Sequence, residues 1–447
     1  MLRREVFCAG YPLSVFLSAA LQYNKEQKEA GRTYLREYSE KAVLVSADLG
    51  EWDTEYSLSE LRALCDTADV EVLAEITQKL DRRNQSTYIG AGKAEEILDL
   101  IEDVEADLVI VDDDLSGVQT RNLEKYFGVP VVDRTTLILD IFARNAVTAE
   151  GKLQVELSQL QYRLPRLIGS GTGLSQQGGG IGTRGPGETK LETDRRHIRS
   201  RIRSLKERLK DMEARREVTR RARRRNGIPI VALVGYTNVG KSSLLNILTG
   251  SSILAEDKLF ATLDPTARRL PVANMQNVIL VDTVGFVSRL PHHLVEAFKS
   301  TLAEAQYADL ILLVADASAE DWSEQLRVTE EVLAELQCSE TPTITVFNKA
   351  DLVDDTDTLP GIPVSAKTGE GLEDLLAEIS EKLSERVVRA TLLFPFDEVG
   401  KAVLLRDRGN IVCEEWTDDG LLVQASVDRA LWPQYIRFQT ETELPDE

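Results

Sequence analysis

The chain is predicted to be an α/β protein made of several domains. Along most of its length, short apolar strands alternate with segments of helical spacing, a pattern typical of a mostly parallel sheet. One apolar, β-branched run, Ile230–Val234, leads directly into GYTNVGKS and then into SLLNILTG, which has the character of a helix. Strand, glycine-rich loop and helix in this order define a P-loop. The sequence therefore predicts a P-loop domain with further domains on either side.

Length and composition support several domains in a soluble protein. A chain of 447 residues is too long for one ordinary core, so two to four domains are expected. Hydrophobic residues make up 43% and charged residues 28%, as in soluble globular proteins. No apolar run reaches the roughly 20 residues of a membrane helix. The four cysteines, Cys8, Cys65, Cys338 and Cys413, are scattered, which argues against a zinc site or disulfide framework and favours a reducing compartment.

Residues 1–40 form an N-terminal extension. Arg3 and Arg4 precede the apolar stretch Leu13–Leu21, which hints at a secretory signal. The interpretation adopted is a short amphipathic or poorly ordered extension on a cytoplasmic protein.

Residues 41–150 are predicted to be a small α/β domain. Strands are expected at Lys41–Asp48, Leu108–Asp112 and Val129–Val132. Helices are expected at Ser59–Ala68 and Ala94–Val104, so that the sheet is mostly parallel.

Residues 151–227 are predicted to be a helical hairpin arm with a glycine-rich loop. Glu150–Arg166 has helical periodicity and is expected to end near Pro165. Gly169–Gly187 holds nine glycines in nineteen residues, too many for a stable helix or strand. Thr189–Arg225 then reads as one long charged helix, which Gly227 and Pro229 end.

The arm carries most of the positive charge. The chain as a whole has a net charge of −21, yet residues 190–226 carry 16 Lys or Arg against 6 Asp or Glu, a net charge of +10. The remainder therefore carries about −31. A basic segment on an acidic protein indicates contact with an anionic partner such as RNA, although such a run is often only a solvated helix face.

The P-loop predicts how phosphates are bound. Glycines at Gly235 and Gly240 let backbone N–H groups curve around the phosphates. Lys241 is expected to contact the β- and γ-phosphates, and the hydroxyl of Ser242 to bind Mg²⁺.

Two further segments complete the predicted phosphate site. The strand Val278–Val281 ends in DTVG, which places Asp282 to hold Mg²⁺ through water and Gly285 to direct its N–H to the γ-phosphate. LFATLDPT supplies Thr262, whose hydroxyl would join the Mg²⁺ shell only while the γ-phosphate is present. Lys241, Thr262 and Gly285 are therefore the candidate catalytic residues.

Guanine specificity is predicted by NKAD after the strand Thr343–Phe347. The carboxylate of Asp351 can accept two hydrogen bonds that guanine offers and adenine does not. Ser365–Lys367 follows another short strand and would place a backbone N–H near the guanine oxygen. The residues predicted to surround the nucleotide are Gly235, Tyr236, Thr237, Asn238, Val239, Gly240, Lys241, Ser242, Phe260, Ala261, Thr262, Leu263, Asp264, Asp282, Thr283, Val284, Gly285, Asn348, Lys349, Ala350, Asp351, Ser365, Ala366 and Lys367.

Phe286 and Asn238 bear on how fast GTP is hydrolysed and whether a monovalent cation takes part. Phe286 stands where signalling GTPases carry a glutamine that orients the attacking water, so intrinsic hydrolysis is expected to be slow. Asn238 is either a ligand of a monovalent cation such as K⁺ or a turn residue that tolerates an unusual backbone angle.

The P-loop domain is expected to span residues 228–387 and a small α+β C-terminal domain residues 388–447. Short strands are predicted at Phe394–Phe396, Ala402–Leu405, Ile411–Trp416 and Leu421–Ala425, and Ala430–Phe438 reads as helix or strand.

The motifs GYTNVGKSSL, LFATLDPT, DTVGFV and NKAD, with GTRGPGETKLETDRRHI ahead of them, resemble the HflX family of ribosome-associated GTPases over roughly residues 41–400. The resemblance implies a cytoplasmic GTP hydrolase with Mg²⁺ that binds the large ribosomal subunit and its rRNA through the arm (169–226) and splits or rescues stalled ribosomes. It also implies a monomer off the ribosome. The hydrophobic residue after DTVG matches the family as well.

Other readings remain open. The chain could be a GTP-dependent ribosome-assembly factor, or the GTPase subunit of an RNA-modifying complex, although it shows no residues for such chemistry itself. The sequence YIGAGK, ending at Lys93 ahead of a helix, could hold a second phosphate, but a glycine turn that starts a helix is the preferred interpretation.

Overall fold

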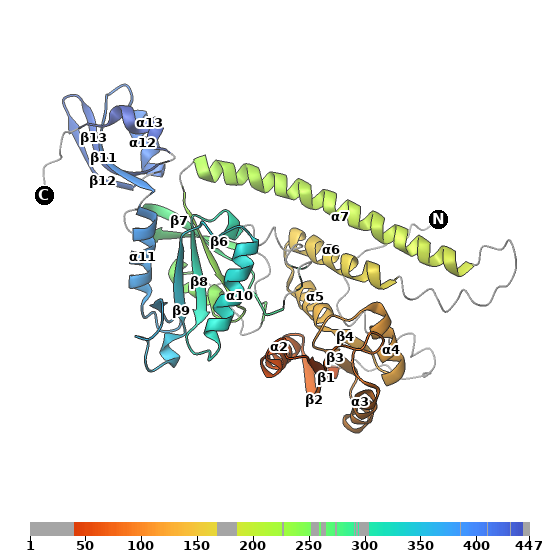
Figure 1. Ribbon diagram of the computed structural model, residues 1–447. Coiled ribbons are helices and arrows are strands. Elements are labelled where there is room, and N and C mark those ends of the chain that lie inside the picture. Colours follow the sequence, from red (N-terminus) through yellow and green to blue (C-terminus); the bar gives the residue numbers. More distant parts are fainter. Residues whose placement is uncertain are drawn as a thin grey trace, which may run out of the picture. The chain divides into compact units, whose positions relative to one another are not determined.

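The computed structural model divides the chain into two compact units (Figure 1). The first comprises Met1–Lys210, Lys258–Phe260 and Arg289–Ala297, and the second comprises Asp211–Asp257, Ala261–Ser288 and Phe298–Glu447. The structure describes residues 40–167, 186–225, 228–251, 259–260, 265–272, 275–289, 291, 294, 304–384, 386–408, 410–429 and 431–440. The predictions for residues 1–39, for most of the glycine-rich loop and for Ala261, Thr262, Leu263 and Asp264 lie outside these residues.

The first unit is built on a four-stranded parallel sheet in the order β2-β1-β3-β4. The middle strand β1 is buried along Ala42–Val45, which explains its unbroken apolar run. Strand β2, absent from the predicted elements, is an edge strand whose half-exposed sequence VEVLAEITQK masked its character. The elements are β1 (Glu40–Asp48), β2 (Val70–Lys79), β3 (Leu108–Val111), β4 (Val131–Asp133), α2 (Thr54–Thr67), α3 (Ala91–Val104), α4 (Gly117–Phe127) and α5 (Arg134–Asn145).

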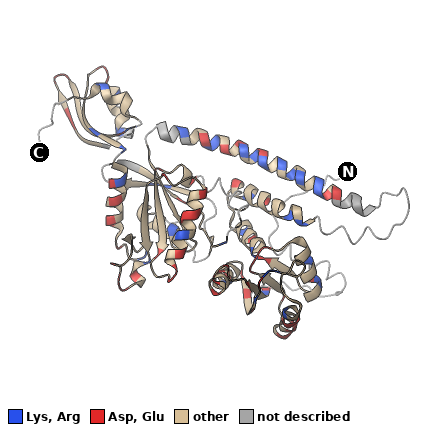
Figure 2. Cartoon of the chain, in the orientation of Figure 1, with Lys and Arg blue, Asp and Glu red and all other residues tan. Residues whose placement is uncertain are grey.

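Two helices follow the sheet, α6 (Ala149–Arg166) and α7 (Pro186–Arg225). Helix α6 includes Pro165, in its last turn, and ends at Arg166. Arg201 of α7 donates to both carboxylate oxygens of Glu156 of α6, at 2.6 and 2.8 Å, and Leu205 of α7 is fully buried. The 40 residues of α7 extend over about 60 Å at 1.5 Å per residue. Figure 2 shows Lys and Arg along much of this helix.

The second unit contains a six-stranded sheet in the order β10-β9-β8-β5-β7-β6. All neighbouring pairs are parallel except β6 with β7. The strands at its centre are buried on both faces, as a parallel sheet covered by helices requires. The elements are β5 (Ile230–Gly235), α8 (Lys241–Thr249), β6 (Thr266–Val272), β7 (Met275–Asp282), β8 (Leu310–Asp316), α10 (Trp322–Glu335), β9 (Thr343–Asn348), β10 (Ile362–Pro363) and α11 (Leu372–Ser384).

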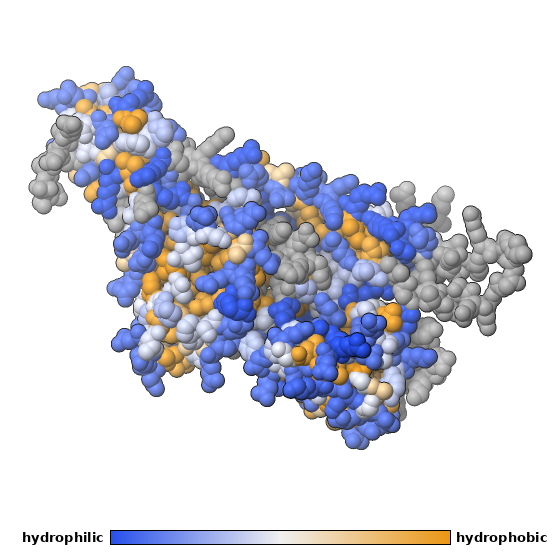
Figure 3. Space-filling view, viewed as in Figure 1, coloured by the Kyte–Doolittle hydropathy of each residue, from blue (hydrophilic) through white to orange (hydrophobic). Residues whose placement is uncertain are grey.

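The same unit ends in a small antiparallel sheet in the order β11-β13-β12. The strands are β11 (Val387–Phe394), β12 (Asn410–Thr417) and β13 (Gly420–Asp428), and the helices α12 (Val399–Arg408) and α13 (Trp432–Tyr435), the latter continued by a 3-10 turn at Ile436–Phe438. Exposed hydrophobic residues appear in orange on this part of the chain at the upper left of Figure 3.

The strand predicted at Ala402–Leu405 was wrong, because these residues lie in α12. Ala402 and Leu405, three residues apart, are buried on one side of the helix, while Val403 and Leu404 between them are about half exposed. A run of four apolar residues does not distinguish a strand from one turn of an amphipathic helix. Ala430–Phe438, left open between helix and strand, is helical from Trp432 to Phe438.

None of the helices in the described parts of the chain is both long and apolar enough to cross a membrane.

Candidate functional site

Four of the predicted motifs follow four strands of the six-stranded sheet at the same edge. GYTNVGKS follows β5, DTVG begins at the last residue of β7, NKAD begins at the last residue of β9, and SAK follows β10. Since β7, β5, β8, β9 and β10 all run parallel to one another, their carboxyl ends meet at one edge of the sheet. Such an edge is where open α/β sheets bind ligands.

Close packing explains the glycines of these loops. A Cβ at Gly235 would lie 2.1 Å from the carbonyl oxygen of Val314, and one at Gly285 would lie 2.8 Å from the Cα of Thr237. Gly240 has φ of +87°, and a Cβ there would lie 2.2 Å from Nδ2 of Asn348. Larger residues would separate the loops, so the three glycines let the motifs approach one another.

Lys241 is a buried cation. Its Nζ donates to the carbonyl oxygens of Gly235 and Tyr236, at 3.1 and 2.6 Å, and the residue is 6% exposed. Burial lowers the pKa of Lys241 to about 8, while the negative charge of Asp282 acts in the opposite direction. The ammonium group is therefore held where an anion would stabilise its charged form.

Ser242 and Asp282 bring a hydroxyl and a carboxylate oxygen side by side. The hydroxyl of Ser242 donates to Oδ2 of Asp282 at 2.6 Å, and Asp282 is 1% exposed. Next to it, the hydroxyl of Thr283 donates to the carbonyl oxygen of Leu233 at 2.7 Å. Hydroxyl and carboxylate oxygens are the ligand types that Mg²⁺ prefers, so the pair fits this ion.

Phe286 joins the phosphate loop to the strand end after β7. Its N–H donates to the carbonyl oxygen of Gly235 at 3.2 Å, and its carbonyl accepts from the N–H of Thr237 at 2.8 Å. The side chain is 1% exposed. The N–H of Ser288 also donates to the hydroxyl of Tyr236. The motif itself did not predict this backbone pairing, which gives Phe286 a structural role.

Asn348 connects three motifs. Its Nδ2 donates to the carbonyl oxygen of Val239 at 2.8 Å, and its Oδ1 accepts from the N–H of Ala366 at 3.0 Å. At 2% exposure it acts as an internal cross-link. The first residue of NKAD thus fixes the phosphate loop and the SAK loop in one arrangement.

Asp351 lies in the same cluster. Its Oδ1 accepts from the hydroxyl of Ser365 at 2.7 Å, and its Oδ2 lies 3.5 Å from Nζ of Lys367. The Ser365 hydrogen bond, with a smaller contribution from Lys367, holds the pKa of Asp351 below its ordinary value. The side chain of Asp351 is 15% exposed, so an ionised carboxylate is presented at the edge of the site.

Asp316, which was not predicted as a site residue, forms an ion pair at 2.7 Å with Lys349 of NKAD. Asp316 is the last residue of β8 and follows the apolar run LILLVA, the signal that identified Asp282 after VILV. Lys349 has φ of +63°, and the ion pair holds its side chain beside the end of β8.

Asn238 has φ of +62°, and its side chain is exposed. The backbone angle agrees with the turn-residue interpretation, and the exposed amide leaves the cation interpretation open.

The YIGAGK segment has the features of a glycine turn at a helix start. The N–H of Gly90 donates to Oε1 of Gln78 at 2.9 Å, and Nζ of Lys93 forms an ion pair with Glu96 at 2.6 Å. Tyr88 is buried, and its hydroxyl accepts from the N–H of Ala47 at 3.1 Å.

Three family models match the chain in sequence. They are described as GTP-binding GTPase N-terminal at residues 55–143, GTP-binding GTPase middle region at residues 145–223 and 50S ribosome-binding GTPase at residues 230–349. The chain is 51% identical over 390 residues to a GTPase HflX of Caldanaerobacter subterraneus subsp. tengcongensis, covering 87% of this chain and 91% of the relative. It is 44% identical over 370 residues to a GTPase HflX of Escherichia coli K12, covering 80% and 86%.

Asp351→Asn is expected to change base preference. An amide can donate one hydrogen bond and accept one, which matches xanthine, whereas the carboxylate accepts two from guanine. Affinity for GTP should fall by tenfold or more, at about 1.5–3 kcal/mol per lost hydrogen bond to a charged group, and affinity for xanthosine triphosphate should rise. Competition with a fluorescent GDP measures both. Unchanged selectivity for GTP would show that Asp351 does not contact the base.

Nucleotide affinity is expected to fall as pH rises from 7.5 to 9. A bound phosphate raises the pKa of Lys241 above the value of about 8 in the protein alone, so binding takes up a proton once that pKa is passed. The limiting slope is about tenfold per pH unit. Calorimetry in buffers of different ionisation enthalpy measures the uptake. In Lys241→Arg, whose charge is constant, this slope should vanish; a flat wild-type profile would contradict the role of Lys241.

Proposed function

Because the chain belongs to the HflX family of GTPases, we propose that it binds the large ribosomal subunit, hydrolyses GTP to GDP and phosphate there, and splits or rescues stalled ribosomes. The observation that carries the ribosomal part is the basic helix α7 on an otherwise acidic chain. The match of residues 230–349 to a family described as 50S ribosome-binding supports the same partner. We also propose that the protein works in the cytoplasm, where GTP is available, and is a monomer off the ribosome.

In the proposed nucleotide complex, the loop Gly235–Gly240 surrounds the phosphates with backbone N–H groups. Lys241 contacts the β- and γ-phosphates, and its buried position makes that charge pairing strong. Ser242 and Thr262 would hold Mg²⁺ directly, and Asp282 would hold it through water. An ion bound there would neutralise charge that develops on the phosphates during transfer.

The proposed base site is formed by NKAD and SAK. Asp351 accepts from the ring N–H and amino group of guanine, and a backbone N–H of Ser365–Lys367 lies near the guanine oxygen. Lys349, held by Asp316, borders the base. Asn348 acts indirectly, since its hydrogen bonds to Val239 and Ala366 position the loops that contact the nucleotide.

Hydrolysis by this site alone should be slow. The N–H of Gly285 is proposed to hold the γ-phosphate, but the next side chain, Phe286, is buried and apolar and cannot orient water. The missing group must then come from elsewhere, and the large ribosomal subunit is the proposed source of stimulation.

A K⁺ ion beside the phosphates, held by Asn238, is a further proposed contribution. Hydrolysis should then be several-fold faster in KCl than in NaCl at equal ionic strength, because a fixed cation stabilises the transition-state charge. Asn238→Ala should abolish the difference between the two salts, and Asn238→Asp serves as a comparison that retains an oxygen ligand. Equal rates in both salts would leave Asn238 as a turn residue only.

Two alternatives remain distinguishable by experiment. A ribosome-assembly factor would bind the subunit in its GTP form without dissociating joined ribosomes, so light scattering of intact ribosomes separates it from a splitting factor. A GTPase subunit of an RNA-modifying complex would need a partner that brings the active site, and it would co-purify with that partner.

The basic end of the arm is expected to contact RNA phosphates. Changing the five arginines within Arg220–Arg225 to glutamine should weaken binding to large subunits and reduce its salt dependence, since each phosphate contact contributes about 0.7–0.9 to the logarithmic slope. Sedimentation across a KCl series measures both quantities. GTP affinity should stay unchanged.

The matched control is the double variant Arg62→Gln, Arg327→Gln, which removes exposed arginines from α2 and α10. Its binding and salt slope should equal those of the wild type. Unaltered ribosome binding by the arm variant would exclude this end of α7 as the contact.

A further inference from the structure

The N-terminal sheet has a cluster of polar side chains where β1 and β3 end, called here the Asp112 cluster. Val45 of β1 pairs with Val111 of β3, so Ser46 and Asp112 follow side by side. In the strand order β2-β1-β3-β4, the chain passes from β1 outward to β2 on one side and from β3 outward to β4 on the other, so the order of connection switches between β1 and β3. In open α/β sheets, ligands bind at the carboxyl ends of strands at such a switch. A ligand of this sheet is therefore expected beside Asp112.

The Asp112 cluster is acidic and needs a cation. The Asp112 side chain is completely buried, and its Oδ2 accepts from the hydroxyl of Ser57 at 2.6 Å. Arg134, at the start of α5, donates to Oδ1 of Asp112 at 2.8 Å but also pairs with Glu60. One arginine thus faces two buried carboxylates. Buried carboxylates are costly unless they are paired, so a second cation is favoured here.

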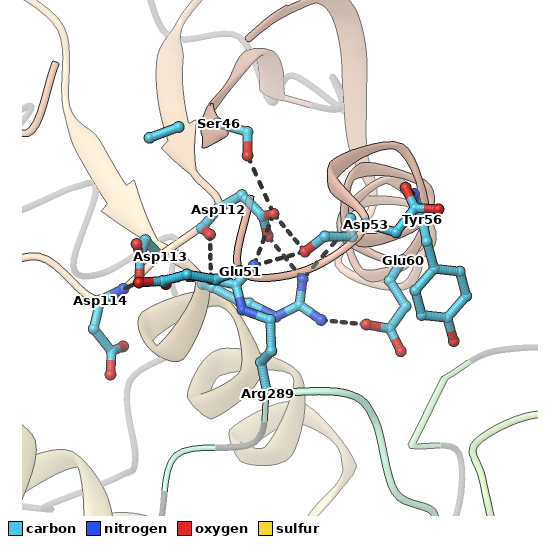
Figure 4. Close-up of polar contacts among 12 residues, drawn as sticks. Ser46, Glu51, Asp53, Tyr56, Glu60, Asp112, Asp113, Asp114 and Arg289 are labelled. Atoms are coloured by element: carbon cyan, nitrogen blue, oxygen red, sulfur yellow. Dashed lines mark hydrogen bonds and ion pairs between the residues drawn. The ribbon is translucent and has the colours of Figure 1, made fainter. Parts of the chain in front are cut away.

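Arg289 contacts Asp112 in this cluster, as Figure 4 shows. Its Nη1 donates to the hydroxyl of Ser57 at 2.7 Å and to Oδ2 of Asp112 at 3.1 Å, and its Nη2 donates to the carbonyl oxygen of Asp112 at 2.7 Å. The guanidinium lies 3.9 Å from the ring centre of Trp52. Hydrogen bonds, ion pairing and a cation–π contact together make a site that matches a guanidinium.

A second short segment is held by helices of the same unit. The N–H of Leu259 donates to the hydroxyl of Thr67 at 3.1 Å, and the carbonyl of Phe260 accepts from Nδ2 of Asn145 at 2.8 Å. The ring of Phe260 is 2% exposed and packs edge-on against Phe142 with centroids 4.6 Å apart. Leu259–Phe260 is thus anchored as firmly as Arg289.

Both anchored segments lie next to the proposed γ-phosphate contacts in the chain. Phe260 is two residues before Thr262, and Arg289 is four residues after Gly285. At about 3.5 Å per residue, these tethers reach no more than about 7 and 14 Å. Phe260 and Arg289 also have φ of +55° and +56°, a backbone region that such residues adopt only where surrounding contacts hold them. A short stretch of chain therefore joins each proposed phosphate contact to its anchor.

We propose that the Asp112 cluster, with Ser57 and Trp52, is a guanidinium-binding seat whose ligand is the chain's own Arg289, and that contacts of Thr262 and Gly285 with a γ-phosphate compete with the seating of Phe260 and Arg289. The N-terminal sheet then responds to whether GTP or GDP is bound. This inference rests on the nucleotide roles proposed above for Thr262 and Gly285. By linkage, any change that weakens the seat raises affinity for GTP relative to GDP.

Trp52 reports on the seat directly. In full-length protein with Trp322, Trp416 and Trp432 changed to Phe, Trp52 emission should differ between GDP and a non-hydrolysable GTP analogue, because Arg289 lies over its ring in the seated form. Arg289→Ala should abolish this difference. Binding of each nucleotide is measured separately with fluorescent analogues. If both bind and Trp52 emission is the same, the seat inference fails alone; if neither binds, the proposed function fails with it.

Affinities test the competition itself. Arg289→Ala and Asp112→Asn should each raise the preference for the GTP analogue over GDP by about fivefold or more, and their effects should not add in the double variant. Ser57→Ala removes one hydrogen bond to Arg289 and tests the seat should Asp112→Asn fail to fold. Arg289→Lys should restore part of the wild-type ratio.

The matched control is Arg83→Ala. Arg83 also lies over Trp52, at 5.4 Å, and pairs with Asp113 and Glu51, but it is remote in sequence from the phosphate motifs. Its nucleotide preference should equal that of the wild type. An unchanged or lowered preference for the GTP analogue in Arg289→Ala would overturn the proposal.

Discussion

The parallel pairing of β5 with β7 on one side and with β8 on the other is the constraint on which the candidate nucleotide site depends. It brings the loops that follow the strands to one edge of the sheet, where motif residues from positions 235–367 lie close together. The loops are then joined by backbone and side-chain bonds. Phe286 pairs with the phosphate loop through its backbone, and Asn348 bonds to both Val239 and Ala366. The site is thus assembled by the sheet and fixed by its own motif residues.

Two buried charged residues, Lys241 and Asp112, determine which groups are favoured beside them. Lys241 is a cation deprived of water, which favours an anion at the phosphate loop. Asp112, in the N-terminal sheet, is a buried anion that binds two arginines, Arg134 and Arg289. The segment from Asp282 to Arg289 connects these two regions. It begins at Asp282, which is proposed to hold Mg²⁺ through water, and ends at Arg289, which pairs with Asp112. The nucleotide and the N-terminal sheet are therefore expected to influence each other through this segment.

Much of this arrangement could be predicted from the sequence, because its signals are local. A buried strand followed by a glycine or a carboxylate identifies the strand end and the motif together, as at Ile230–Val234 and Val278–Val281. The parallel N-terminal sheet was predicted from three such strands and confirmed. What could not be predicted depends on contacts between distant segments. Arg289 reads as an ordinary surface arginine until Asp112, 177 residues away, is seen beside it.

Local ambiguity accounts for the other failures. The edge strand β2 alternates apolar and charged residues in a way that a helix also allows, and Ala402–Leu405 is too short to distinguish a strand from a helical turn. Asp316 was not predicted although it ends an apolar strand as Asp282 does, because the residues after it form no recognised nucleotide-binding motif.

The most direct test of the account is the rate of GTP hydrolysis by the full-length protein with and without purified large ribosomal subunits. Since Phe286 cannot orient water, the account predicts slow hydrolysis by the protein alone and strong stimulation, on the order of tenfold or more, by the subunit. The same slow rate with and without subunits, under conditions in which GTP is bound, would contradict the proposed role at the ribosome.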